Sequence, residues 1–228
     1  MNINNVTLPT YSKKEEQFNI ISHGIASLLG LLALILMLVK AVPSHDGFVI
    51  ASVIIYGACL FIMFGISCVY HSLTKSNLKK MFRILDHTAI HIFIAGTYTP
   101  YTLIALRPIN IWHMGVGTFA YIMFAVVWAL NFVGIVVNLI DIQKYRRISF
   151  ICSLTSGWFI GIALFILWEV ITPAGVLLLL MGGILYTIGS IIYAIGKKED
   201  KPNYHFIFHL FVLLGAICMF LSVYLFVL

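Results

Sequence analysis

The chain has 228 residues, of which 61% are hydrophobic and only 10% are charged, and its mean hydropathy is +1.04. A soluble domain carries about 25% charged residues, so this composition excludes an ordinary soluble protein and indicates an integral membrane protein. The net charge of +6 does not indicate a nucleic-acid partner, because basic residues in membrane proteins mark the cytoplasmic loops.

Seven apolar runs are long enough to cross a bilayer, which takes about 20 residues. The first 17 residues are polar and show no cleavable signal peptide. We therefore expect a short cytoplasmic segment (1–17) followed by an all-α transmembrane domain (18–228). The predicted spans are 18–40, 48–72, 84–106, 111–139, 148–168, 174–195 and 204–227. The fourth is the longest, and we expect it to tilt or kink.

Basic residues predict the orientation of these spans. Twelve lysines and arginines fall on the side of the N-terminal tail: Lys13, Lys14, Lys75, Lys79, Lys80, Arg83, Lys144, Arg146, Arg147, Lys197, Lys198 and Lys201. The other side carries only Lys40 and Arg107. The positive-inside rule then places the N-terminus in the cytoplasm and the C-terminus outside. This orientation disfavours a G-protein-coupled receptor, and a last span without lysine disfavours a retinal protein.

The chain begins its first span with two motifs. SKKE, from Ser12 to Glu15, fits a helix capping box. Glu16, Asn19 and His23 then form ExxNxxxH at the cytoplasmic start of the span. Two interpretations stay open for this motif. Its side chains could hydrogen-bond the residues that bind a metal, or they could make ordinary hydrogen bonds at a helix end.

Ionisable residues gather at the cytoplasmic ends of three spans. Span two ends in SCVYH with Ser67 and His71, span three carries Asp86 one turn in, and span seven begins with His205 and His209. Ionisable groups inside a bilayer are costly and usually functional. Three imidazoles that share one depth fit a catalytic zinc site with an open fourth position. Asp86 would then hold a water molecule at the metal rather than the metal itself.

These motifs together resemble the PAQR family, which includes the adiponectin and progestin receptors and the bacterial haemolysin III proteins. The resemblance lies in SCVYH, LDHTAI, GTYTP, the early EEQFNIISHG and the late HFIFH, and it covers essentially all seven spans. The length and the GTYTP form are most similar to the haemolysin III, or membrane-homeostasis, branch. The resemblance implies Zn²⁺ on His71, His205 and His209.

The resemblance also implies roles for two further residues and a type of chemistry. It implies that Asp86 contacts the water at the zinc and that Ser67 stands one turn before the first ligand. The wider superfamily contains alkaline ceramidases, so amide hydrolysis is implied as well. The receptors' large N-terminal region is missing from this sequence, which argues against a ligand-receptor function.

Other residues on these spans offer competing assignments. His87 and His91 are four residues apart and could be alternative ligands, but we favour a structural or supporting role. Cys68 could form a CxxH ligand pair with His71, but we favour packing. All four cysteines, at positions 59, 68, 152 and 218, are read as reduced packing residues. Pro100 is expected to kink span three, with Thr97 or Thr99 satisfying the freed backbone.

Three functions fit these observations. The first is a zinc-dependent hydrolase of a lipid amide or ester, with Asp86 as the base and Ser67 assisting it. The second is a haemolysin-type pore acting in cytolysis, which the apolar outer half disfavours for a monomer. The third is a signalling or structural membrane protein with a zinc clamp. The expected partner is a membrane lipid as substrate or ligand, and homo-oligomers are left open.

Overall fold

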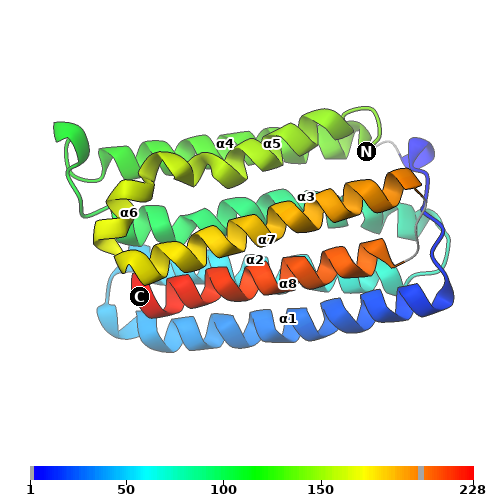
Figure 1. Cartoon of the computed structure of the whole chain (residues 1–228), viewed down its shortest axis with the longest axis horizontal. Coiled ribbons are helices and arrows are strands. Elements are labelled where there is room, and N and C mark those ends of the chain that lie inside the picture. Colours follow the sequence, from blue (N-terminus) through cyan, green and yellow to red (C-terminus); the bar gives the residue numbers. More distant parts are fainter. Residues whose placement is uncertain (1–2, 200–202) are drawn as a thin grey trace.

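The computed structural model describes residues 3–199 and 203–228. Over these residues the chain is helical and contains no strand, which confirms the predicted all-α class. The same residues contain seven helical segments long and apolar enough to cross a membrane. Figure 1 shows them side by side in one elongated bundle. The predicted orientation across the membrane stays a prediction, and Lys201 lies outside the described residues.

The main helices are α1 (Lys13–Ala41), α2 (Gly47–Ser72), α3 (Asn77–Pro100), α4 (Thr118–Asp141), α5 (Arg146–Trp158), α6 (Leu164–Val170), α7 (Thr172–Glu199) and α8 (Tyr204–Ser222). A π-helical segment, Tyr101–Leu106, extends α3, and a second one, Val223–Val227, extends α8. A 3-10 segment, Phe159–Ala163, joins α5 to α6 within one span. Each span packs against its neighbour in sequence, and α1 also packs against α8.

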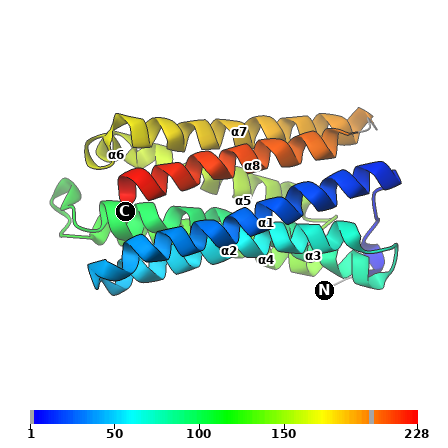
Figure 2. The ribbon, with the colours of Figure 1, turned by 90° about the horizontal axis from the view of Figure 1, so that it is seen from below.

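Contacts at both ends fix α1 and α8 as parallel neighbours. At one end the backbone N–H of Asn203 donates to the Glu15 carboxylate, at 2.8 Å. At the other end Lys40 donates to the carbonyl oxygen of Tyr224, at 2.6 Å. The first and last spans therefore run in the same direction, and the N- and C-termini lie at opposite ends of the bundle (Figures 1 and 2).

Span three, formed by α3 and its π-helical extension, is the centre of the bundle. The structure buries 78% of its apolar window, against 28–44% for the other six spans. Large apolar side chains on the outer helices point away from the bundle instead, as Leu28 and Val39 of α1 do at 67% and 70% exposure. Those exposed surfaces suit a lipid environment, where apolar side chains need no burial against protein.

Small residues allow α1 and α2 to pack closely. A Cβ atom added at Gly30 would lie 2.9 Å from the backbone nitrogen of Phe61. One added at Gly57 would lie 2.6 Å from the Cβ atom of Leu34. Glycine is required at both positions because no side chain fits between the two backbones.

Side-chain caps start the first three main helices. The predicted capping box is present: Ser12 accepts from the Glu15 N–H, and Glu15 accepts from the Ser12 N–H. The helix that starts there continues without a break through residue 18, where the first span was predicted to begin. Asp46 caps α2 and forms an ion pair with Arg107, whose hydrogen bond lowers the pKa of the Asp46 carboxyl.

The structure differs from the prediction in the starts of spans three and four and in the regularity of span five. Span three starts at Asn77 rather than 84. The fourth helix, α4, begins at Thr118 rather than 111 and is not the longest. The polypeptide turns before it, with positive φ angles at Trp112, Gly115 and Gly117, so the apolar run from 111 cannot be one helix. Span five is interrupted by its 3-10 segment.

Pro100 is followed by a π-helical segment. Thr97 and Thr99 donate to the carbonyl oxygens of Phe93 and Ala95. The carbonyl that a helical N–H at position 100 would have bonded belongs to Gly96. These two threonines therefore do not satisfy the freed group, and the N–H of the next residue, Tyr101, donates to the carbonyl oxygen of Tyr98.

Candidate metal centre

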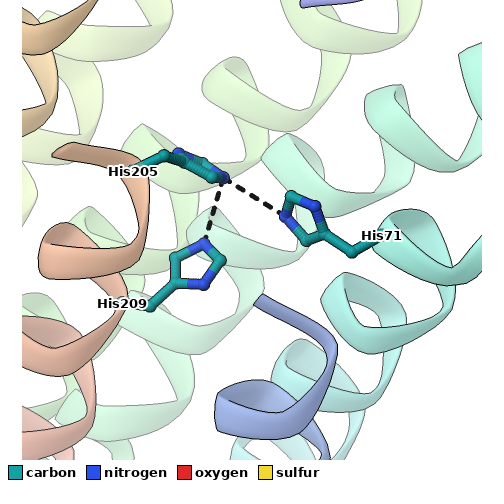
Figure 3. Close-up of side chains that lie close together, drawn as sticks. All are labelled: His71, His205 and His209. Carbon is teal, nitrogen blue, oxygen red and sulfur yellow. Dashed lines mark hydrogen bonds between the residues drawn. The ribbon is translucent and has the colours of Figure 1, made fainter. Parts of the chain in front are cut away.

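Three histidines from two helices meet at the end of the bundle where α1 begins. His71 lies in the last turn of α2, and His205 and His209 lie on successive turns of α8, so their side chains share a face. The Nε2 atom of His205 is 3.2 Å from Nε2 of His71 and 3.1 Å from Nε2 of His209 (Figure 3). His71 and His209 are each only 2% exposed.

This geometry fits a zinc ion. A tetrahedral ion with Zn–N bonds of about 2.0–2.1 Å holds its nitrogens about 3.3–3.4 Å apart. The two observed separations are close to that value, and the candidate ligand atoms of all three residues lie within 4.8 Å of one another. Across the described residues, no fourth histidine, cysteine, aspartate or glutamate joins this group. The donor set is three imidazoles with one position open, the usual arrangement of a catalytic zinc site.

Glu16 contacts the nitrogen of His71 that faces away from the other two histidines. Its Oε2 atom lies 2.6 Å from Nδ1 of His71. An ionised carboxylate can only accept, so this contact favours the form of a neutral ring with the hydrogen on Nδ1 and the lone pair on Nε2. The second carboxylate oxygen of Glu16 accepts from Lys79, also at 2.6 Å. The Asn19 side chain approaches the same Nδ1, with its amide nitrogen at 3.4 Å.

The other two histidines also contact residues near the start of the chain. The Tyr11 ring stacks on His205, with centroids 5.0 Å apart and planes inclined by 15°. Burial raises the pKa of Tyr11 well above its usual value, so the phenol stays neutral. The His23 ring lies against His209, with centroids 3.7 Å apart. For ExxNxxxH, these contacts favour the reading in which the motif supports the ligand histidines.

Ser67 and Asp86 lie beside the histidines rather than among the ligands. The Ser67 side chain is 2% exposed and hydrogen-bonds the Asp86 carboxylate, which also interacts electrostatically with His71. Asp86 is not part of the group of atoms that could hold an ion. The arrangement agrees with an aspartate that contacts water, and the catalytic roles of both residues stay predictions.

The other residues considered as metal ligands are not part of the histidine cluster. Both ring nitrogens of His91 are hydrogen-bonded, Nδ1 to Asn131 at 3.1 Å and Nε2 to Ser149 at 2.9 Å. This favours the structural reading of His91. The Cys68 thiol donates to the carbonyl oxygen of Ile20, at 3.5 Å, which suits packing. His87 is not part of the cluster either.

Sequence reasoning missed several residues around the centre. The sequence marks Lys79 only as one of the basic residues of the cytoplasmic side, but it lies in the first turn of α3 and is only 5% exposed. The sequence also does not single out Tyr11, or, away from the centre, Asn131, the fully buried partner of His91 in α4. A polar residue in an apolar run is a signal for the asparagine. Nothing in the local sequence marks the tyrosine, because its contact depends on tertiary structure.

Comparison with known proteins identifies the family. The Haemolysin-III related family matches residues 11–220. "Hemolysin-3" of Bacillus cereus is 36% identical over 223 residues, which cover 98% of this chain and 96% of that protein. The "Hemolysin-3 homolog" of Bacillus subtilis (strain 168) is 36% identical over 213 residues, covering 93% and 94%. No solved structure matches the chain significantly. The chain therefore belongs to the haemolysin-III family, as its motifs predicted, and is a multi-pass integral protein of the bacterial cell membrane.

Proposed function

We propose that the protein is a zinc-dependent hydrolase that cleaves an amide or ester bond of a membrane lipid. One observation carries the proposal: three imidazoles, two of them buried, converge on one point, and a hydrogen-bonded carboxylate lies beside it without closing the fourth position. A purely structural zinc site is usually closed by a fourth protein ligand. The open position is where water and substrate would bind.

The residues divide the proposed chemistry between them. His71, His205 and His209 would hold the ion, which would acidify a water molecule and polarise the lipid carbonyl. Asp86 would take the proton of the attacking water and return it to the leaving amine or alcohol. Ser67, hydrogen-bonded to Asp86, would keep this carboxylate in position.

The position of the site supports a lipid substrate. His71 lies in the last turn of α2 and His205 in the first turn of α8, so the cluster lies near one end of the spans rather than at their middle. The amide and ester bonds of membrane lipids lie near the polar interface, at the ends of a spanning helix. A lipid carbonyl can therefore reach the depth of the histidines while its chains stay in the hydrocarbon layer.

Two other functions have specific support. The name Hemolysin-3 of the relatives favours a pore. However, the bundle interior is packed with side chains such as Tyr56, Phe64 and Tyr101, each 0–1% exposed, which argues against a channel through a single chain. A zinc clamp, in which the ion has only the structural role of holding α2 and α8 together, is favoured by the position of the histidines on these two helices. It leaves the adjacent Ser67–Asp86 pair without a function.

The test is lipid turnover by the purified protein in lipid nanodiscs. N-acylsphingosine and a diacyl phospholipid serve as the amide and ester substrates, and mass spectrometry measures the released fatty acid. We expect release by the zinc-loaded protein, loss of release after chelation, and recovery when Zn²⁺ is restored. A zinc-loaded protein that releases no fatty acid from either lipid contradicts the hydrolase and leaves the clamp.

A further inference from the structure

We propose that Glu16 is a positioning residue for the metal centre: anchored by Lys79, it orients His71 so that Nε2 faces the ion. This inference rests on the metal site of the proposed function, but not on hydrolysis. It assigns a role to Glu16, the first residue of ExxNxxxH, and to Lys79, which the sequence marks only as a basic residue of the cytoplasmic side.

The first step is the tautomer of His71. In a neutral imidazole one nitrogen carries a hydrogen and the other a lone pair, and only the lone pair can bind a metal. The Glu16 Oε2 atom, 2.6 Å from Nδ1, can accept a hydrogen but cannot donate one when ionised. The hydrogen is therefore held on Nδ1, and Nε2 is left free on the side where His205 lies.

The second step is the position of Glu16 itself. Its other oxygen, Oε1, accepts from the ammonium of Lys79 at 2.6 Å. Lys79 also donates to the carbonyl oxygen of Leu73 at 2.9 Å, and its ammonium lies 5.2 Å from the centre of the Tyr70 ring. Because each oxygen of the carboxylate has its own partner, Glu16 cannot turn away from His71 without losing its partly buried ion pair with Lys79.

The third step is what this arrangement does for metal binding. A carboxylate that accepts the second N–H of a ligand histidine fixes the ring orientation and makes the ligand nitrogen more basic. Loss of such a partner typically lowers metal affinity about 10- to 100-fold. Glu16 lies on α1, His71 on α2 and Lys79 on α3, so three helices must be packed together before this ligand is oriented.

The experiment compares Glu16→Gln with Glu15→Gln. The neighbouring carboxylate of Glu15 accepts from the backbone of Ser12 and Asn203 and contacts no ligand histidine, so its variant removes the same charge elsewhere. Zinc affinity is measured by competition with a chromogenic chelator in detergent, without any lipid substrate. We expect Glu16→Gln to lose about 10- to 100-fold in affinity and Glu15→Gln less than about threefold.

Two further measurements separate positioning from simple stabilisation. The visible spectrum of bound Co²⁺ should change in Glu16→Gln, because one ligand is no longer held in place, and should not change in Glu15→Gln. The metal-free melting temperature is recorded alongside. If Glu16→Gln lowers that temperature but keeps wild-type affinity and the wild-type Co²⁺ spectrum, Glu16 is a structural link and the inference is wrong.

A second variant covers the case in which Glu16→Gln does not fold. Glu16→Asp keeps the charge, but its side chain is too short to reach both His71 and Lys79. We expect this variant also to bind zinc more weakly than wild type and to show a changed Co²⁺ spectrum. Wild-type affinity in that variant would overturn the inference. A wild-type protein that binds no zinc would instead contradict the proposed function itself, so the two failures are distinguishable.

Discussion

The Tyr11 ring lies flat on the His205 imidazole, with ring centres 5.0 Å apart and planes only 15° from parallel. It is one of three related contacts, because Glu16 bonds His71 and His23 packs on His209. Each candidate ligand thus touches at least one residue between Tyr11 and His23. The start of the chain is therefore part of the wall of the candidate metal centre.

Removing the Tyr11 ring should loosen the metal without abolishing its binding. A stacked aromatic pair contributes about 0.5–1.5 kcal/mol, which corresponds to about a twofold to tenfold change in rate. We expect Tyr11→Ala to release zinc to excess EDTA faster by that factor, whereas Tyr11→Phe, which keeps the ring, releases it at the wild-type rate. Equal release rates in all three proteins would mean that the stacking does not hold His205.

Helix packing predicts opposite effects of alanine at two glycines. An added Cβ at Gly57 meets both the side chain and the backbone of Leu34, whereas one at Gly157 meets nothing within 4 Å. Gly57→Ala should destabilise the protein by about 1–3 kcal/mol, the usual cost of overpacking. Gly157→Ala should be neutral or stabilise it by up to about 1 kcal/mol. Thermal melting in detergent measures both, and a Gly57→Ala protein as stable as wild type would refute the close α1–α2 contact.

The predicted topology places residue 3 in the cytoplasm and residue 228 outside. Ile3→Cys and Leu228→Cys are introduced separately into a chain whose four cysteines have been replaced. An impermeant maleimide added to intact cells should label position 228 at once and position 3 only after permeabilisation. Labelling in the reverse order would invert the assignment and move the metal centre to the outer side.

Asp86→Asn tests whether Asp86 acts as a base rather than as a zinc ligand. The amide keeps the shape of the side chain and a hydrogen bond but cannot act as a base. Zinc content should stay at the wild-type value, while release of fatty acid from a lipid amide should fall about 100-fold or more. Turnover at the wild-type rate would remove Asp86 from the mechanism, and loss of zinc would make it a ligand.

The spans and the histidines of the cluster could be predicted because their signals are local. HFIFH places His205 and His209 on one helical face whatever surrounds them, and the apolar runs need only composition. The start of α4 could not be predicted in this way. The residues from 111 to 117 are mostly apolar, and the positive φ angles at Trp112, His113, Gly115 and Gly117 are what show that the chain turns there.

The partners of the ligands were beyond local reasoning for another reason. The motif placed Glu16 near the site but left its role open, because its partner depends on how α1 is rotated against α2 and α3. Lys79 follows a short break after α2 and has the sequence features of a solvated loop residue, yet the fold buries it against Glu16. Such pairings depend on tertiary packing.

The central claim is that His71, His205 and His209 bind one zinc ion, and metal content tests it most directly. Elemental analysis of purified protein should give about one Zn²⁺ per chain for wild type and a clear loss in His209→Ala. His91→Ala is the matched control: it should keep its zinc and lose about 1–3 kcal/mol of stability, because Asn131 and Ser149 lose a buried partner. Equal zinc in wild type and His209→Ala, or loss of zinc only in His91→Ala, would contradict the site.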